Sequence, residues 1–462
     1  MPNKLPYFED NSLNYYNVPK DARTNNFLEN YNGYIKNKLG KFRTVNWVNF
    51  LNFIKEESDR SIQKLLATNI KTEKYSYKPS KEIKLKKGNI MNQMNNLNKS
   101  KTNEYKKDIS SDYKKLINDT ININTDDNDI LKIINKKIGI KNLGNTCYIN
   151  SFIQILLHNP LFLELFSHKI KNNAPNENTL SFNLYKICNA YLNQIENKNS
   201  ILDISDLVKI FKNKHSQFSG LGQKDTTEFF ELFLSDISSE LNEVKRIPNY
   251  YEIKNSDFLS KNEFFNLYYQ NFISREKSII TDLFYSQLIS IYKCACEKEI
   301  YGLQNILDFP ILLSNKKSVE LKNLLEEYFN SEDIEFFEEC TKCKKTNIIH
   351  NKTIKIANPP KILILSLQRK NPLNNTKNNC IVYFDEILNL SNYIDEELCK
   401  DSEFNYELYG VINHIGSLEF GHYFTFIKML NNKKWIEYND SVVKEIDQLD
   451  CTNAYCLIYI KS

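Results

Sequence analysis

The chain has 462 residues, a formal net charge of +4 and 41% hydrophobic residues. Such a balanced charge does not favour nucleic acid or a membrane surface as a partner, and no apolar run approaches the roughly 18 residues needed to span a bilayer. Ten cysteines are too few for a disulfide scaffold, and the opening residues MPNKLPYFED lack the apolar segment of a secretory signal. We therefore expect a protein of a reducing compartment, in the cytoplasm, the nucleus or both.

Residues 1–137 differ in composition from the rest of the chain. From about Lys71 onward they are dominated by Lys, Asn, Asp and Ser, and so polar a segment cannot bury enough apolar surface to fold. We expect this N-terminal extension to be largely disordered, apart from a possible helix near 44–57. There, the amphipathic i, i+3, i+4, i+7 pattern is formed by Trp47, Phe50, Leu51 and Ile54. That helix would pack on the main domain or bind a partner.

The folded domain is expected over residues 138–462, and it opens with a distinctive cysteine. In GIKNLGNTCYINSFIQILLHNP, apolar residues recur every three or four positions after Cys147, which predicts a buried helix ended by Asn159-Pro160. Asn145 or Thr146 would cap this helix and place Cys147 in its first turn. The unpaired N–H groups there favour a thiolate and can hold a developing oxyanion. A cysteine at a helix start is otherwise often only a small buried hydrophobe.

Two further stretches precede the C-terminal strands. GLGQKDTTEFFELFLSDI predicts a helix that starts near Asp225, with Asp225 and Glu228 as a capping box and a plain buried face. Farther on, two close cysteine pairs lie about 45 residues apart, Cys294-Ala-Cys296 and Cys340-Thr-Lys-Cys343. Two such pairs match the ligand set of a structural, tetrahedral zinc ion, and the alternative is four free thiols.

The last block contains a histidine with a candidate partner. The strand patterns His422–Met429 and Trp435–Tyr438 flank a polar loop at Asn431-Asn432, which predicts an antiparallel hairpin. Folding this hairpin brings His422 within a residue or two of Asn439 and Asp440. Either side chain could orient the imidazole of a histidine that serves a nucleophile. The register alone does not choose between them.

Taken together, these blocks resemble the ubiquitin-specific protease family of deubiquitinases. NLGNTCYINSFIQIL is similar to the family's cysteine box, and HIGSLEFGHYFTF with WIEYNDSVV to its histidine box. The blocks between and after them also match, in the family's order: GQKDTTEFF, PPKILILSLQRK, VYFDEILNLSNYI and AYCLIYI.

The resemblance implies a papain-like α+β fold with fingers, palm and thumb, the fingers lying at about 290–350. It implies that Cys147 is the nucleophile, His422 the base, Asn439 the third member with Asp440 in support, and Asn142 the oxyanion donor. Gln223 and Asp225 would line a channel for the ubiquitin tail, with His414 near it. The four cysteines, Cys294, Cys296, Cys340 and Cys343, would hold zinc in the fingers, although C-x-C replaces the family's usual C-x-x-C.

The implied activity is thiol-dependent hydrolysis after the C-terminal glycine of ubiquitin, with ubiquitin and ubiquitinated proteins as partners. Three alternatives remain open on the sequence. The same chemistry could act on another ubiquitin-like modifier, the chain could be a catalytically silent ubiquitin-binding scaffold, or it could be a general papain-like peptidase. The complete Cys, His and Asn set argues against the scaffold.

Overall fold

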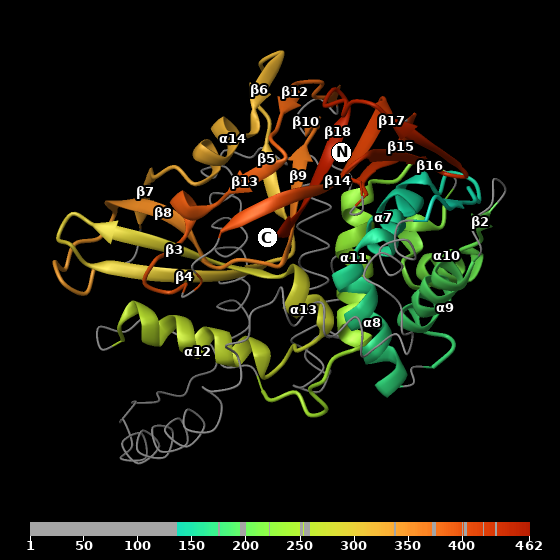
Figure 1. The fold of residues 1–462 in the computed structure, drawn as a ribbon. Coiled ribbons are helices and arrows are strands. Elements are labelled where there is room, and N and C mark those ends of the chain that lie inside the picture. The colour runs from blue at the N-terminus through green and yellow to red at the C-terminus, as the bar shows by residue number, and fades with distance from the viewer. Residues whose placement is uncertain are drawn as a thin grey trace, which may run out of the picture. The chain divides into compact units, whose positions relative to one another are not determined.

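The computed structural model describes most of the chain after residue 135 (Figure 1). The described residues are 136–173, 176–194, 200–220, 222–249, 253, 259–336, 339–371, 376–399, 401, 404–418, 420–429 and 432–462. The expected helix near 44–57 and nearly all of the N-terminal extension lie outside them. Every helix within the described residues is too short or too polar to cross a membrane.

The first half of the domain is a group of helices, the thumb. After the short strand β1 (Gly139–Ile140), it contains α7 (Cys147–His158), α8 (Pro160–Asn173), α9 (Leu180–Asn193), α10 (Ser205–Lys214), α11 (Thr226–Glu240) and α13 (Ile279–Phe284). The strand β2 (Ile201–Leu202), which pairs in parallel with β1, and a 3-10 turn (Ser216–Phe218) complete this part. The predicted helix at the cysteine is confirmed, because α7 runs from Cys147 to His158 and Asn159 follows as its C-cap.

An eight-stranded sheet, the palm, lies beside these helices. Its strand order is β17-β16-β15-β14-β18-β9-β5, with β13 also paired to β14. The strands are β5 (Phe309–Leu312), β9 (Ile362–Gln368), β13 (Ile387–Asn389), β14 (Asn405–Gly416), β15 (Gly421–Lys428), β16 (Trp435–Asn439), β17 (Val442–Ile446) and β18 (Ala454–Lys461).

The sheet is covered on both faces because its strands carry apolar residues on both. In β9, Ile362 and Ile364 join the core shared with the helices, whereas Leu363, Leu365 and Leu367 join the core on the opposite face. This is the alternation that successive strand residues impose. The second core also includes residues of α14 (Leu321–Tyr328), β12 (Ile381–Tyr383) and a 3-10 turn (Ser391–Tyr393). Strand β12 pairs with β6 (Ser318–Glu320), and β10 (Lys370–Asn371) pairs with β11 (Thr376–Lys377).

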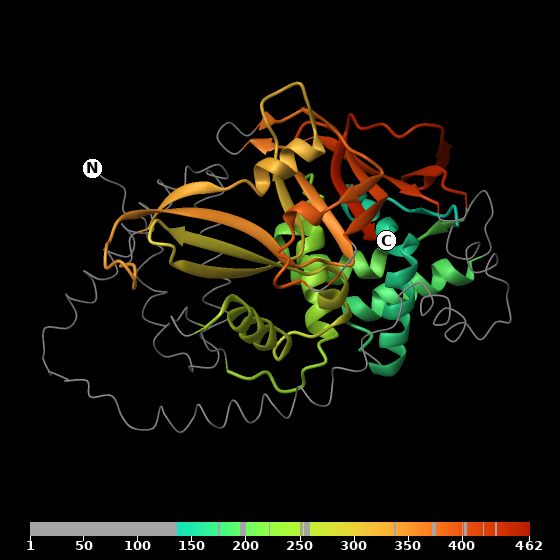
Figure 2. The same cartoon turned by 60° about the vertical axis from the view of Figure 1, so that its left-hand side comes forward.

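A second, four-stranded sheet forms the fingers. Its order is β4-β3-β8-β7, from β3 (Ser286–Cys294), β4 (Glu299–Ile306), β7 (Glu332–Phe336) and β8 (Ile348–Asn358). Figure 2 shows these long strands projecting away from the thumb helices, with α12 (Lys261–Ile273) alongside. Their outer turns place the two cysteine pairs at the end of the sheet.

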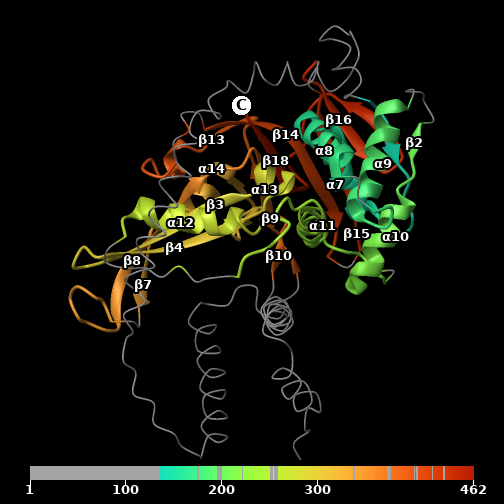
Figure 3. The same ribbon diagram turned by 90° about the horizontal axis from the view of Figure 1, so that it is seen from below.

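Helix α7 is held between the helices and the palm. It packs against α8 and α11 on one side and against β14, β15 and β16 on the other, an arrangement visible in Figure 3. All twelve of its residues are buried. The hydroxyl of Thr425 in β15 donates to the carbonyl of Ser151 in α7 at 2.9 Å, and Gly410 in β14 leaves room for Ile155, whose Cδ1 would lie 2.4 Å from an added Cβ. The middle of α7 is thereby fixed against β14 and against β15, the strand that carries His422.

Candidate active site

Cys147 is the first residue of α7, and a turn of unusual backbone precedes it. Gly144 has a φ of 93° and Asn145 a φ of 52°, values that glycine and asparagine tolerate better than other residues. The Asn142 side-chain oxygen accepts a hydrogen bond from the Gly144 N–H at 2.9 Å. Thr146 occupies the N-cap but makes no side-chain bond to the helix, because its hydroxyl accepts from the Leu143 N–H instead. Cys147 itself is 2% exposed.

His422 lies next to Cys147 at the start of β15. Its Nε2 is 2.7 Å from Oδ1 of Asn439. Because a carbonyl oxygen only accepts, Nε2 carries a proton, and in a neutral imidazole Nδ1 is left as the basic nitrogen. Hydrogen bonding to the Cys147 sulfur is the largest cause that raises the pKa of His422, to about 9, and the Asn439 bond acts in the same direction.

The predicted hairpin is confirmed, and its geometry separates the two candidate partners of His422. The pairs Thr425↔Tyr438 and Lys428↔Trp435 set the register, and Asn431 of the expected turn lies outside the described residues. Asn439 is the last residue of β16, and its amide is fixed by donating to Glu437 Oε1 at 3.3 Å. Glu437 in turn pairs with Lys444 at 3.1 Å.

Asp440 turns away into a left-handed conformation, with a φ of 51°. Its carboxylate accepts from Nδ2 of Asn142 and from Nδ2 of Asn150, each at 2.7 Å, and its carbonyl accepts from the Ile140 N–H at 2.8 Å. Asp440 therefore ties β1, the turn before Cys147 and helix α7 to the end of β16. Asn142, expected as an oxyanion donor, already gives one of its two N–H donors to Asp440.

The three residues expected near a substrate tail lie on different elements. Gln223 donates to Asn145 Oδ1 at 3.4 Å, which brings it to the turn before Cys147. Asp225 is the N-cap of α11, and its side chain accepts from the Thr227 N–H. The predicted capping box is therefore wrong, because a capping box requires the Asp225 side chain to accept from the N–H of Glu228. The second oxygen of Asp225 accepts from the Tyr455 hydroxyl at 2.7 Å.

His414 in β14 is the third of these residues, and it is nearly enclosed. It is 3% exposed. The centroid of its ring lies 4.3 Å from the ring centroid of Tyr423 and 5.6 Å from that of Tyr455. Burial and the nearby cationic Lys377 and Arg369 side chains lower the pKa of His414 to about 3. Tyr455 thus connects Asp225 to His414.

Several residues that complete this arrangement were missed in the sequence. Asn150 offered a weak signal, as a polar residue three positions after Cys147 in a helix whose twelve residues are all buried. Glu437 lies only two residues before Asn439 in the same strand, a spacing that by itself marks no hydrogen bond. Tyr455 offered no signal, because it meets Asp225 across 230 residues.

The four cysteines of the two pairs converge at the end of the fingers. All four sulfur atoms lie within 4.8 Å of one another, with Cys294 and Cys343 at 3.9 Å and Cys296 and Cys340 at 3.6 Å. Tetrahedral zinc with sulfur ligands at about 2.3 Å separates the sulfurs by about 3.8 Å. Hydrogen bonding from the Cys343 backbone is the main cause that lowers the pKa of Cys340, to about 6. In Cys294, a backbone hydrogen bond from Cys296 is outweighed by burial and the other three thiols, which raise the pKa to about 12, so the spacing of the sulfur atoms is what supports a metal site. The cluster could therefore hold a structural zinc ion.

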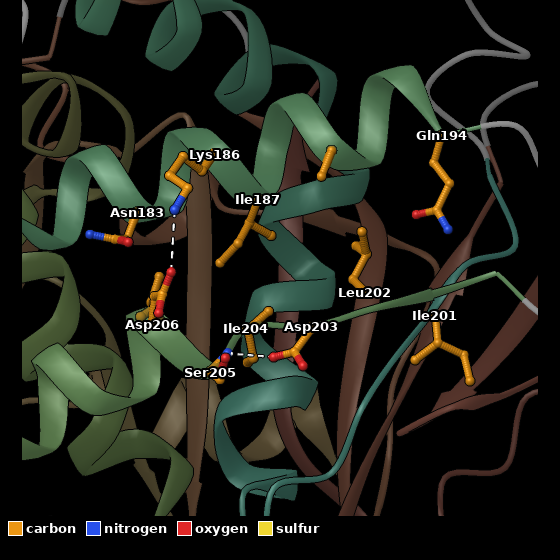
Figure 4. Close-up of a pocket in the computed structure, with 12 residues that line it drawn as sticks. Asn183, Lys186, Ile187, Gln194, Ile201, Leu202, Asp203, Ile204, Ser205 and Asp206 are labelled. Carbon is orange, nitrogen blue, oxygen red and sulfur yellow. Dashed lines mark hydrogen bonds and ion pairs between the residues drawn. The ribbon is translucent and has the colours of Figure 1, made fainter. Parts of the chain in front are cut away.

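A surface cavity of about 400 Å³ lies between α9, β2 and the start of α10 (Figure 4). The ion pair between Lys186 and Asp206, at 3.2 Å, crosses its edge. Its lining includes none of the residues described at Cys147 or at the four cysteines, so it is separate from the candidate active site.

The folded part of the chain matches a known protein family. The family model described as "Ubiquitin carboxyl-terminal hydrolase" matches residues 138–459. The chain belongs to the ubiquitin carboxyl-terminal hydrolase family. The resemblance drawn from the sequence motifs is thereby confirmed, and the family is one of cysteine-type deubiquitinases.

Curated relatives agree with this assignment. The chain is 30% identical to ubiquitin carboxyl-terminal hydrolase Usp2 of Drosophila melanogaster, over 70% of this chain and 34% of the relative. It is 25% identical to ubiquitin carboxyl-terminal hydrolase 8 of Saccharomyces cerevisiae, over 70% of each. The chain thus spans about a third of the Drosophila relative that it matches.

Solved structures of the family share the fold. The Ubp8 module of SAGA bound to monoubiquitin is matched with a TM-score of 0.56 at 24% identity, over 70% of this chain and 69% of that one. The expected α+β fold with fingers, palm and thumb is confirmed by this likeness.

Proposed function

We propose that this member of the ubiquitin carboxyl-terminal hydrolase family cleaves the isopeptide or peptide bond after the C-terminal glycine of ubiquitin. The observation that carries the proposal is the alignment of Cys147, His422 and Asn439. A thiol at a helix start lies against an imidazole whose far nitrogen is hydrogen-bonded at 2.7 Å to a fixed amide oxygen. A nucleophile, a base and an orienting group are the parts that covalent acyl transfer requires.

In the proposed reaction the Cys147 sulfur attacks the glycine carbonyl carbon, after its proton has passed to Nδ1 of His422. His422 then protonates the leaving amine, and a thioester remains on Cys147. The first N–H groups of α7 would hold the oxyanion, because Thr146 does not cap them. His422 finally takes a proton from water, the hydroxide attacks the thioester, and the carboxylate product leaves a free thiol.

Several residues would prepare this site without reacting. Asp440 fixes Asn142, whose second N–H would assist in holding the oxyanion. Gln223, Asp225 and His414 would line the path of the ubiquitin tail, because they meet near the turn before Cys147 and around Tyr455. Ubiquitin and ubiquitinated proteins would be the partners. Family structures bound to monoubiquitin support this assignment.

The four cysteines of the fingers would bind zinc as a structural ion. Their spacing fits four sulfur ligands, and a bound ion would fix the turn after β3 to the loop between β7 and β8. The ion would take no part in the Cys147 chemistry. The small net charge of +4 and the cysteines, which are free thiols, support a location in the cytoplasm, the nucleus or both.

The direct test of activity is hydrolysis of a fluorogenic amide at the C-terminus of ubiquitin. We expect turnover that is lost in Cys147→Ala and retained in Cys451→Ala, an isolated cysteine used as the matched control. Parallel substrates built on ubiquitin-like modifiers, and a modifier-free peptide, test the other specificities. Turnover of the free peptide alone would replace the proposal with a general peptidase, and ubiquitin binding without turnover would replace it with a scaffold.

A further inference from the structure

The end of β14, opposite His422, extends past its neighbour on one side. On that side, β18 begins at Ala454, which pairs with Asn413, and the His414 N–H donates to the carbonyl of Asn453 at 2.9 Å. On the other side, β15 continues, with Ile415 opposite His422 and Gly416 opposite Gly421. The last residues of β14 therefore have a partner strand on only one side, the side of His422.

A lysine takes the place of the missing strand. In a strand, the carbonyls of alternate residues point to the same side, so those of His414 and Gly416 both face the side where β18 has ended. The Lys377 Nζ donates to the His414 carbonyl at 2.7 Å and to the Gly416 carbonyl at 3.0 Å. The residue between them, Ile415, is the one that pairs with His422.

The base of this lysine is itself fixed. The carbonyl of the next residue, Asn378, accepts from the Arg369 guanidinium at 2.9 Å, and the same guanidinium donates through Nε to the carbonyl of Ala454 at 2.6 Å. Arg369 is 2% exposed. Lys377 is thus anchored, through a buried side chain, to the first residue of β18.

We propose that Lys377 is a positioning residue for His422: its two hydrogen bonds keep the end of β14 extended, and β14 in turn fixes the strand that carries the histidine. The proposal rests on the proposed function for its effect on turnover. Lys377 reacts with nothing itself. It acts through the backbone of Ile415, and it is outside the set of residues expected to touch ubiquitin or Cys147.

Besides its pairing with β15 and the turn in which the Ser417 N–H donates to the Phe420 carbonyl at 2.9 Å, this end of the strand gains little from the side chains of its last two residues. Ile415 is 42% exposed, so it adds little apolar packing. Gly416 has a φ of 93°, which lies outside the range of extended strand backbone. Burial and the neighbouring Arg369 lower the pKa of Lys377 to about 8, so the amine is a charged donor below that pH. Hydrogen bonds from a charged donor are stronger than neutral ones, and two of them converge here. Loss of the amine would leave both carbonyls to water and let the strand end move relative to Cys147.

The test compares Lys377→Met and Lys377→Arg with Lys355→Met. Lys355 is the matched control, because its Nζ also donates to a backbone carbonyl, that of Asn392 at 2.7 Å, but on β8 in the fingers. On the fluorogenic ubiquitin amide, Lys377→Met should lower kcat about tenfold with little change in KM. Lys377→Arg, which retains charged donors, should recover most of kcat, and Lys355→Met should behave as wild type.

A second measurement needs no substrate. The NMR titration midpoint of the His422 imidazole should fall in Lys377→Met, because the contact between His422 and Cys147 is loosened, and should stay unchanged in Lys355→Met. A folded Lys377→Met protein with wild-type kcat and an unchanged His422 midpoint would overturn the proposal. If Lys377→Met does not fold, Lys377→Gln is judged by the same criteria.

The titration also separates the two proposals. If the wild-type chain does not hydrolyse the ubiquitin amide, the proposed function fails, and the His422 midpoint alone then decides the role of Lys377. A lowered midpoint in Lys377→Met would still support positioning, and an unchanged one would refute it.

Discussion

Replacing Asn439 tests whether a neutral amide orients the His422 imidazole. Its Oδ1 accepts from His422 Nε2 at 2.7 Å, and Glu437 fixes the amide so that the oxygen faces the histidine. Asn439→Ala leaves a half-buried N–H without this partner. Such a loss costs about 1–3 kcal/mol, and if the full cost falls on the transition state, kcat decreases about 5- to 150-fold. KM should change little, because Asn439 is not expected to touch ubiquitin.

Steady-state kinetics on the fluorogenic ubiquitin amide measure this split. Asn439→Asp keeps an acceptor for Nε2–H and should therefore retain far more activity than Asn439→Ala. Asn351→Ala is the matched control, because Asn351 Nδ2 donates to Asp333 at 3.0 Å on the exposed fingers and its loss should leave kcat unchanged. An Asn439→Ala variant that raises KM with an unaltered kcat would refute the orienting role.

Three further predictions concern Asp440, His422 and the four cysteines of the fingers. Asp440→Ala should lower kcat about tenfold or more, because two asparagine amides lose their 2.7 Å acceptor; equal kcat values for variant and wild type would contradict this. The pKa of His422 is raised to about 9, above its ordinary value near 6.5, so its contribution to the free energy of unfolding is full below about pH 6.5 and is lost as the pH rises through about 9. In urea unfolding, the free energy of unfolding should fall less between neutral and alkaline pH in Cys147→Ala than in the wild type. Identical pH profiles for the two proteins would contradict this. Metal analysis should find about one zinc per chain, with a lower melting temperature in Cys343→Ser than in Cys451→Ser; wild-type metal content and stability in Cys343→Ser would exclude the metal site.

The local elements of the site could be predicted from the sequence because each depends on short-range pattern. The apolar spacing after Cys147 specifies α7, and Asn159-Pro160 ends it. The alternating strands around the Asn-rich loop specify the hairpin that brings His422 near Asn439 and Asp440. The hairpin register could not separate these two neighbours. The structure does so because β16 ends at Asn439 and the backbone at Asp440 turns left-handed.

The remaining contacts could not be predicted because they join segments that are distant in sequence. Asn150 meets Asp440 across 290 residues, and Tyr455 meets Asp225 across 230. Lys377 has no local pattern that marks it, since its role depends on where β18 begins relative to the end of β14. Such contacts follow from strand order and register in the palm, which residue patterns within one element do not specify.

The central claim is that Cys147 is a nucleophile directed at the C-terminus of ubiquitin. The most direct measurement is intact mass spectrometry after incubation with ubiquitin that carries a thiol-trapping group at its C-terminus. The account predicts a mass increase of one ubiquitin in the wild-type chain, its absence in Cys147→Ala, and its retention in Cys451→Ala. A folded wild-type chain that gains no mass, or an increase that persists in Cys147→Ala, would contradict the claim.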